Sequence, residues 1–229
     1  ARGAGPVAFI VFVIGAASGL YAGLFMAPAE KFQGDSARIM YVHVPAAWTA
    51  LAAYSFIAMM SLIAFVWRHS LADVAARSAA LPGVVFTGLA LFTGAVWGKP
   101  TWGTWWLWDA RITSMLILLF LYLGVIALYE AYDNKAAASR ACAVLSLVGT
   151  VNIPIIYKSV DWWYSLHQPA SIKFTGGSSI DPSMLYPLLL SIIAFYGLFS
   201  CALLGNMRAE ILARETRTAW VRRLAGGEA

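Results

Sequence analysis

Six long apolar runs are the feature of this sequence that most constrains its fold. They fall near residues 6–27, 45–67, 82–97, 112–129, 141–157 and 184–205. Each run has a length that crosses roughly 30 Å of hydrocarbon as a helix, because an α-helix rises about 1.5 Å per residue. The sequence therefore predicts an all-α integral membrane bundle of six transmembrane helices, which forms one domain over residues 1–229.

The composition supports a membrane location. Hydrophobic residues make up 61% of the chain and charged residues only 12%, whereas about a quarter of a water-soluble globule is charged. The first run contains the small residues Ala16, Ala17 and Ser18, as a signal peptide would, but it stays apolar through Met26. That length exceeds a typical signal-peptide core, so we expect a retained span.

The basic residues predict the orientation. With six spans, both termini share a side, and that side carries ten of the sixteen Lys and Arg residues: Arg2, Arg68, Arg77, Lys135, Arg140, Arg208, Arg214, Arg217, Arg222 and Arg223. Because positive loops resist translocation, we expect both termini to be cytoplasmic. The opposite loops, 28–44, 98–111 and 158–183, then face outward, and the cytoplasmic loops are 68–81 and 130–140.

Several functional classes are disfavoured. The net charge of +5 reflects membrane topology and contact with the lipid bilayer, and no nucleic acid is expected as a partner. The spans hold hardly any ionisable side chains, which argues against an ion pathway. Cys142 and Cys201 lie inside predicted spans and form no CxxC pair, so no disulfide or thiol relay is predicted.

Local signals predict details of the helices. Pro45 and the pair Asp181-Pro182 are typical of helix entries. Asn152 and Pro154 predict a polar contact and a kink in the fifth span. The glycines of the third span indicate close helix packing: Gly83, Gly88 and Gly94.

The most unusual stretch is WGKPTWGTWWLWDAR at residues 97–111, which holds five of the ten tryptophans. If 101–109 is helical, one face carries Trp102, Trp105, Trp106 and Asp109. If it is extended, one side aligns Trp102, Thr104, Trp106 and Trp108. Gly98, Pro100 and Gly103 leave both conformations open.

Two interpretations of these tryptophans compete. An aromatic belt at the headgroups explains Trp48, Trp67 and Trp220. It explains five rings in one connection less well, because a belt distributes its rings around a bundle. The other interpretation is a platform for a large, flat, apolar ligand, on which indoles stack and to whose polar edge indole N–H groups donate. Porphyrin has that shape.

The histidines favour the second interpretation. Of the three, His43 in MYVHVPAAW is expected at the outer mouth of the second span and His167 in DWWYSLHQPAS in the last outer loop. Both share the predicted side of the tryptophans, and two imidazoles from separate loops can hold a haem iron from opposite faces. A lone loop histidine is more often simply solvated, and His69, at the cytoplasmic end, is expected to be one. No CxxCH motif for covalent haem is present.

A haem also needs cations for its propionates. The basic residues on the predicted outer side are candidates, with arginine favoured for bidentate contacts: Arg38, Lys99, Arg111, Lys158 and Lys173. Alternatively, Asp109 and Arg111 simply pair with each other at a helix start.

The motifs WGKP, WGTWWLWD, HVPAAW and WWYSLHQPASI resemble the bacterial cytochrome c maturation protein C (CcmC) family, the haem exporter protein C family with its tryptophan-rich WWD domain. The resemblance runs from APAE at 27–30 to DPSM at 181–184. It implies a bacterial inner-membrane protein that holds haem b non-covalently on the periplasmic face. By residue, it implies His43 and His167 as axial ligands and a haem platform of Trp102, Trp105, Trp106, Trp108 and Asp109, beside the candidate Arg111.

The resemblance also implies partners. Haem would pass to a periplasmic haem chaperone, CcmE, beside the ABC transporter subunits CcmA and CcmB and the small membrane subunit CcmD. The chain has no Walker A pattern, so any ATP use belongs to a partner. We expect a haem-transfer protein rather than an enzyme. Two alternatives are a haem lyase that attaches haem covalently, like longer tryptophan-signature relatives, and a structural or quinone-contacting subunit without haem.

Overall fold

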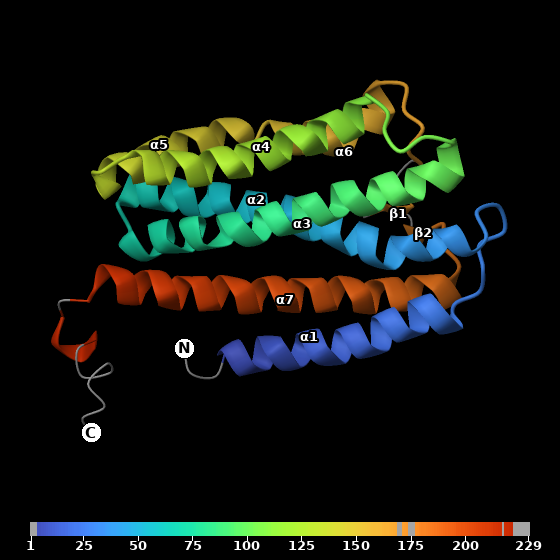
Figure 1. The fold of residues 1–229 in the computed structure, drawn as a ribbon, viewed down its shortest axis with the longest axis horizontal. Coiled ribbons are helices and arrows are strands. Elements are labelled where there is room, and N and C mark those ends of the chain that lie inside the picture. The colour runs from blue at the N-terminus through green and yellow to red at the C-terminus, as the bar shows by residue number, and fades with distance from the viewer. Residues whose placement is uncertain (1–3, 169–170, 174–176, 217, 222–229) are drawn as a thin grey trace.

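The predicted class of fold is confirmed. A computed structural model describes residues 4–168, 171–173, 177–216 and 218–221 (Figure 1). The described chain is a helical membrane bundle in which six segments are long and apolar enough to cross a membrane. In chain order the elements are α1 (Ala4–Tyr21), the π-helical turn η1 (Ala22–Met26), the 3-10 helix η2 (Asp35–Ile39), α2 (Met40–Trp67), α3 (Ser70–Trp102), α4 (Ala110–Ala131), α5 (Lys135–Gly149), α6 (Asn152–Trp162), the antiparallel pair β1 (Ile172–Lys173) and β2 (Gly177–Ser178), and α7 (Pro182–Arg214).

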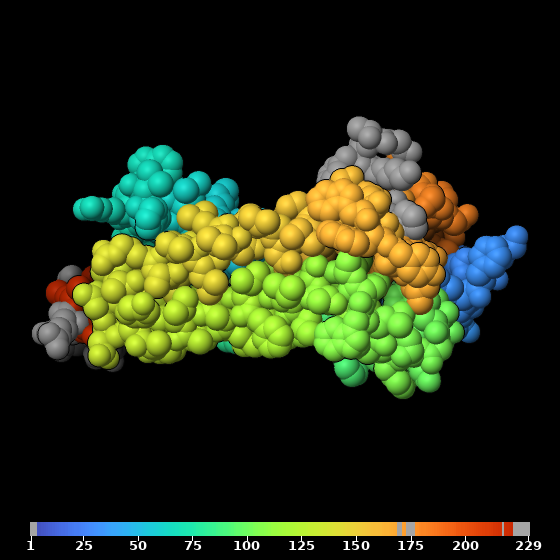
Figure 2. All heavy atoms as spheres, turned by 90° about the horizontal axis from the view of Figure 1, so that it is seen from above, coloured from blue at the N-terminus to red at the C-terminus, as the bar shows by residue number. Residues whose placement is uncertain are grey.

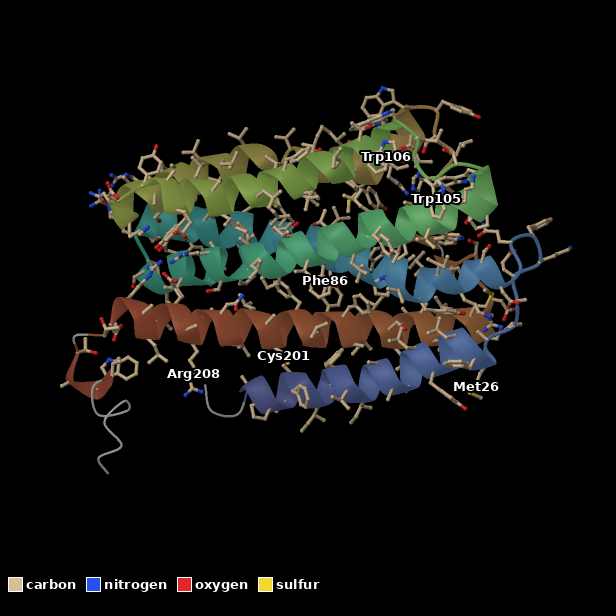
Figure 3. All side chains as sticks on the ribbon, in the orientation of Figure 1. Met26, Phe86, Trp105, Trp106, Cys201 and Arg208 are labelled. Atoms are coloured by element: carbon tan, nitrogen blue, oxygen red, sulfur yellow. The ribbon has the colours of Figure 1, made fainter. Side chains whose placement is uncertain are left out.

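The helices form three tiers (Figure 1). α1 lies along α7, α2 lies along α3, and α4 packs against both α5 and α6. Small residues of α2 and α3, among them Ala50, Ala53 and Ala79, are fully buried between the tiers. Seen from above, the segment that follows α6 lies against the connection between α3 and α4 at one end of the bundle (Figure 2). We call this the tryptophan end; Trp105 and Trp106 lie there, and Arg208 lies towards the other end (Figure 3).

The helices extend well beyond the apolar runs, so the expected loop bounds were wrong. The predicted loop 68–81 is mostly the start of α3, and 130–140 is mostly the ends of α4 and α5. Likewise, α2 begins at Met40 and is preceded directly by η2, so much of the predicted loop 28–44 is helical. Hydropathy finds only the part of a helix that is apolar, whereas alanine-rich segments such as 70–81 continue the helix with polar residues.

Pro45 is not a helix entry. It lies inside α2 and is fully buried, because α2 already begins at Met40, directly after η2. The Asp181-Pro182 prediction is confirmed: Asp181 caps α7, and its Oδ1 accepts a hydrogen bond from the amide of Ser183 at 2.9 Å. The predicted polar contact of Asn152 is confirmed too, since its side-chain amide donates to the carbonyl of Ser114 at 2.9 Å. The predicted interruption of the fifth span is the break between α5 and α6, just before Pro154.

The third-span glycines differ from one another. An added Cβ at Gly83 would overlap the ring of Tyr122, and one at Gly94 would lie 3.0 Å from Cε1 of His43. At Gly88 it would meet nothing within 4 Å. Close packing is therefore confirmed for Gly83 and Gly94 and is wrong for Gly88.

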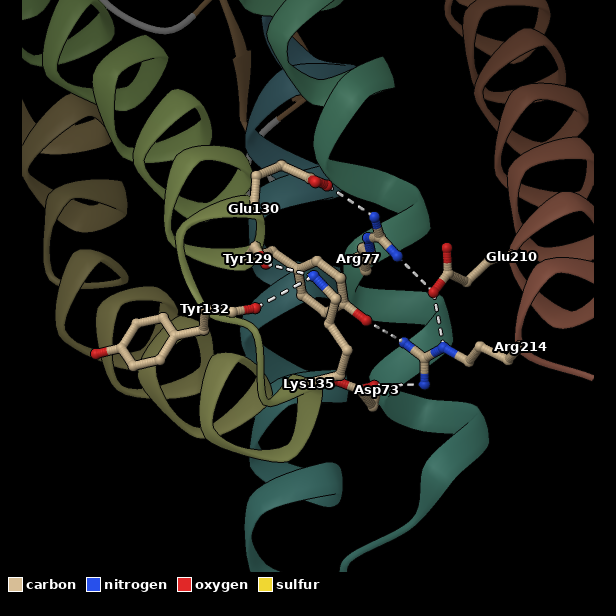
Figure 4. A network of polar contacts seen from close by, with 8 residues as sticks. All are labelled: Asp73, Arg77, Tyr129, Glu130, Tyr132, Lys135, Glu210 and Arg214. Carbon is tan, nitrogen blue, oxygen red and sulfur yellow. Dashed lines mark hydrogen bonds and ion pairs between the residues drawn. The ribbon is translucent and has the colours of Figure 1, made fainter.

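A network of charged side chains ties α3, α4 and α7 together at the end opposite the tryptophans (Figure 4). Arg77 pairs with Glu130 at 2.9 Å and with Glu210, and its guanidinium carbon lies 3.6 Å from the ring centroid of Tyr129. Arg214 pairs with Glu210 at 2.7 Å and with Asp73 at 2.8 Å. Two basic residues used in the orientation argument are thus structural. Another four lie outside the described residues: Arg2, Arg217, Arg222 and Arg223.

Glycine lets α1 and α7 touch through their backbones. An added Cβ at Gly19 would lie 2.6 Å from the amide nitrogen of Ser191 and 2.9 Å from the carbonyl carbon of Leu190. Main-chain atoms cannot rotate away as a flexible side chain can. The spacing of these two helices therefore depends on the missing side chain.

We expect Gly19→Ala to destabilise the bundle by about 1–3 kcal/mol, because the methyl group forces α1 away from α7. Thermal unfolding of the purified protein in detergent would measure the loss. Gly5→Ala is the matched control on the same helix, since a Cβ there meets nothing within 4 Å. Equal melting temperatures for the two variants would contradict the expectation.

Candidate functional site

The tryptophan-rich connection is neither a helix nor a regular strand. α3 continues to Trp102 and ends at Gly103, whose φ of 79° lies in the left-handed region that glycine adopts without strain. Thr104–Trp108 is irregular, and α4 begins after Asp109. The helix that would have aligned Trp102, Trp105, Trp106 and Asp109 is therefore absent, because a helix stop and a helix start both lie inside the segment.

Asp109 has two separate hydrogen-bonding duties. Its Oδ1 accepts the amide N–H of Ile112 at 2.8 Å and so caps α4. Its Oδ2 accepts from Nδ1 of His167 at 3.0 Å and from the hydroxyl of Ser165. Ser165 in turn accepts the amide N–H of His167 at 3.2 Å. The side chains of His167 and Asp109 are only 18% and 10% exposed, so water competes little for these bonds.

This arrangement selects the proton position on His167. A carboxylate only accepts hydrogen bonds, so Nδ1 carries the proton that is shared with Asp109. In a neutral imidazole, Nε2 then keeps its lone pair. The ring also packs against Trp102, with centroids 4.8 Å apart at 64°. Histidines that bind metals in proteins typically donate their other ring N–H to a carboxylate or a similar acceptor, and His167 is held in this way.

His43 is held in the same sense by a different partner. It was expected in a loop at the mouth of the second span, but it lies inside α2 and faces α3. Its Nδ1 donates to the carbonyl of Ala90 at 3.0 Å and lies 3.2 Å from the hydroxyl of Thr93. Nε2 again keeps its lone pair. Gly94 leaves room for the ring, and Trp97 packs edge-on to it with centroids 5.7 Å apart.

The structure brings the two imidazoles to the same region of the bundle. His43 packs on Trp97 and His167 packs on Trp102, and both tryptophans lie in the last turns of α3. No group of three or more His, Cys, Asp or Glu able to hold a metal ion occurs among the described residues. A ligand set of two imidazoles suits an iron whose other coordination positions are filled by a macrocycle. The third histidine, His69, lies apart and caps α3 by accepting the amide of Ala72 at 3.3 Å.

The predicted tryptophans play different parts. Trp102 packs on His167, while Trp105 and Trp108 are 57% and 75% exposed. Trp106 packs edge-on against Trp108, with centroids 5.4 Å apart. Its indole Nε1 is buried and has no hydrogen-bond partner among the described residues. A buried donor without an acceptor is costly, so Trp106 fits a ligand with an acceptor at its edge.

Most candidate propionate partners already have other contacts. Arg38 pairs with Asp35 at 2.9 Å and also donates to carbonyls of η1. Lys158 pairs with Asp161 at 3.0 Å, and Lys99 donates to the carbonyl of Gly103 at 3.1 Å. The fourth candidate, Lys173, lies in β1.

Arg111 joins α4 to α6 instead of pairing with Asp109. Its Nε donates to the hydroxyl of Ser159 at 3.2 Å and Nη2 donates to the carbonyl of Tyr157 at 3.3 Å. It therefore helps to position the segment that carries His167.

Two residues of this site were not predicted from the sequence. Ser165 links Asp109 to His167, but a serine in a polar loop carries no signal of its own. Trp97 packs on His43, and its indole donates to Gln33 at 2.8 Å. Its place at the start of the tryptophan-rich stretch was the available signal.

The carboxyl group of Asp109 is ionised over a wide pH range. Burial raises its pKa, but the hydrogen bonds from His167, Ser165 and the Ile112 amide lower it more, and the pKa falls from 3.8 to about 2. Since the folded state holds this carboxylate below its ordinary pKa, its contribution to stability is complete above pH 3.8 and is lost as the pH falls towards 2.

We therefore expect the melting temperature of the wild-type protein to fall steeply between pH 3.8 and 2. The melting temperature of Asp109→Asn should fall less steeply, because this variant has no carboxylate to protonate at position 109. Thermal unfolding in detergent across this range would measure both slopes, and the other carboxyl groups contribute equally to each. Parallel slopes would contradict the assignment.

These features define a class: a multi-pass helical membrane protein with two oriented imidazoles and a tryptophan-rich connection at one end of its bundle. Comparison with known proteins identifies the family. The family profile described as "Heme exporter protein C" matches residues 1–222. The chain belongs to the haem exporter protein C family, as the motifs predicted.

Individual relatives agree. The chain is 53% identical to "Heme exporter protein C" of Bradyrhizobium diazoefficiens over 206 residues, which cover 90% of this chain and 78% of that protein. It is 48% identical to the Escherichia coli K12 protein of the same name, over 88% of this chain and 81% of the relative. A "Putative cytochrome c biosynthesis ccmC-like mitochondrial protein" of Marchantia polymorpha is 42% identical over 86% of this chain and 83% of its own length.

Proposed function

We propose that this protein binds haem b non-covalently at the periplasmic face of the bacterial inner membrane and delivers it to the haem chaperone CcmE during cytochrome c biogenesis. The names of the relatives support a role in haem handling and transport rather than a classical enzymatic activity. The observation that carries the proposal is the matched orientation of His43 and His167: in each, Nδ1 donates a hydrogen bond, and Nε2 has no hydrogen-bond partner among the described residues.

This geometry supports a particular binding mode. His43 on α2 and His167 in the loop after α6 are the axial ligands of the iron. Trp105, Trp106 and Trp108 cover the apolar macrocycle, and Nε1 of Trp106, which has no hydrogen-bond partner among the described residues, donates to a carboxylate at its edge. The exposed indoles also keep a poorly soluble cofactor at the surface, where a chaperone can dock on the same loops.

The proposed assembly includes CcmE as acceptor, the ABC transporter subunits CcmA and CcmB, and the small membrane subunit CcmD. Both termini lie in the cytoplasm in this orientation, and the tryptophan end lies in the periplasm. Six spans place both termini on one side, and the basic residues of the opposite end favour the cytoplasm for it.

We expect His43→Ala and His167→Ala to lower haem occupancy about tenfold or more, because each removes one iron ligand. Soret absorbance per purified protein measures this occupancy. His69→Asn is the control, since asparagine keeps a capping side chain and His69 lies apart from the site. Normal occupancy in both alanine variants would refute the ligand assignment.

Transfer is tested separately by mixing the haem-loaded protein with the haem-free chaperone. We expect haem to move to the chaperone, whereas a haem lyase would attach it covalently to an added apocytochrome. A structural subunit would show no Soret band at all.

A second prediction concerns the space around His43. Gly94→Val should lower haem occupancy several-fold, because a side chain at this position presses against the imidazole, whose Cε1 is only 3.0 Å from an added Cβ. Gly88→Val is the matched control on the same helix, where an added Cβ meets nothing within 4 Å. Equal occupancy in the two variants would contradict the placement of His43.

A further inference from the structure

The two imidazoles have unequal partners on their Nδ1 atoms. His167 donates to a carboxylate oxygen of Asp109 at 3.0 Å, whereas His43 donates to a neutral backbone carbonyl, that of Ala90, at 3.0 Å. A charged acceptor makes a stronger hydrogen bond than a neutral one and makes the imidazole a better electron donor. The difference is built into the fold, because the carbonyl belongs to α3 and the carboxylate caps α4.

The carboxylate is itself fixed from both sides. The Ile112 amide holds Oδ1, while the Ser165 hydroxyl shares Oδ2 with His167. Ser165 also accepts the backbone N–H of His167. Both the ring and the main chain of His167 are therefore held in place by hydrogen bonds that lead to the first turn of α4.

We propose that Asp109 and Ser165 are positioning residues that hold His167 with Nε2 open and make it the stronger of the two iron ligands. The inference rests on the proposed function, since it concerns the same haem. In this inference Asp109 acts on His167, an iron ligand, and does not contact the macrocycle. His43, which has no carboxylate partner among the described residues, would then be the weaker of the two ligands.

The substitution Asp109→Asn removes the hydrogen bond to His167 and keeps the one that caps α4. The retained carbonyl oxygen can still accept the Ile112 amide, and asparagine is itself a good helix cap. The new NH2 group replaces Oδ2 and faces Nδ1 of His167. An NH2 group only donates, so it favours the tautomer with the proton on Nε2, in which the iron-binding lone pair is lost.

The first measurement needs no haem. The chain has only three histidines, so nitrogen NMR of protein labelled at histidine resolves each ring and reports its tautomer. We expect the Nδ1–H form at His167 in the wild type, a shift towards Nε2–H in Asp109→Asn, and a smaller shift in Ser165→Ala. Each NMR signal is assigned from the variant in which that histidine is substituted.

The second measurement is the rate of haem loss to a haem scavenger. We expect Asp109→Asn to accelerate loss about 10- to 100-fold, in the range found when outer partners of ligating histidines are removed. Ser165→Ala should accelerate it less. Thr93→Val, which removes the second contact of His43 Nδ1 but leaves the Ala90 carbonyl, should have the smallest effect.

Asp181→Asn is the matched control, because it makes the same chemical change at the cap of α7. Its histidine spectrum and its haem loss should equal those of the wild type. If the wild type holds haem through both histidines but Asp109→Asn changes neither tautomer nor loss rate, the inference is overturned and the proposed function stands. If the wild type binds no haem, both are overturned.

Discussion

The hydrogen bonds of the Asp109 carboxylate connect two parts of the molecule that lie far apart in the sequence, the start of α4 and the loop that carries His167. One oxygen ends the tryptophan-rich connection by starting α4, and the other holds His167, 58 residues later in the chain. The orientation of His167 therefore depends on where α4 begins. Arg111, two residues on, ties the same turn to α6 through Ser159. A single helix start thus fixes both the imidazole and the helix that leads to it.

The two ends of the bundle differ in what their polar groups do. At the opposite end, Arg77, Arg214, Glu210 and Asp73 satisfy one another and join α3 to α7. At the tryptophan end, Nε2 of both imidazoles and the indole N–H of Trp106 have no hydrogen-bond partner among the described residues. Unmet hydrogen-bonding capacity inside a structure has a cost. Buried hydroxyl groups without a partner among the described residues also occur elsewhere, at Tyr41, Tyr54 and Ser191 for example. At the tryptophan end such a group lies near two oriented imidazoles and exposed aromatic rings, and this combination supports a ligand site there.

Much of this could be predicted from residues alone. Apolar length predicted six spans, and the motifs predicted the family. The bounds of the helices were harder, because hydropathy reports what lies in hydrocarbon rather than what is helical. Alanine-rich and charged turns such as those at Ser70 and Lys135 prolong the helices beyond the apolar runs. Pro45 was misread for the same reason, since α2 already begins at Met40, before the apolar run.

The sequence by itself determined the helical membrane class and the family, and it singled out the histidines and tryptophans of the candidate site, because these depend on residue type and local spacing. Only the tertiary structure decided which atoms meet. It put His43 on a helix against Ala90 and Gly94, and it gave His167 a carboxylate partner from α4. Such contacts depend on the packing of helices distant in sequence, and no local pattern encodes the hydrogen-bond partner of a side chain across a bundle.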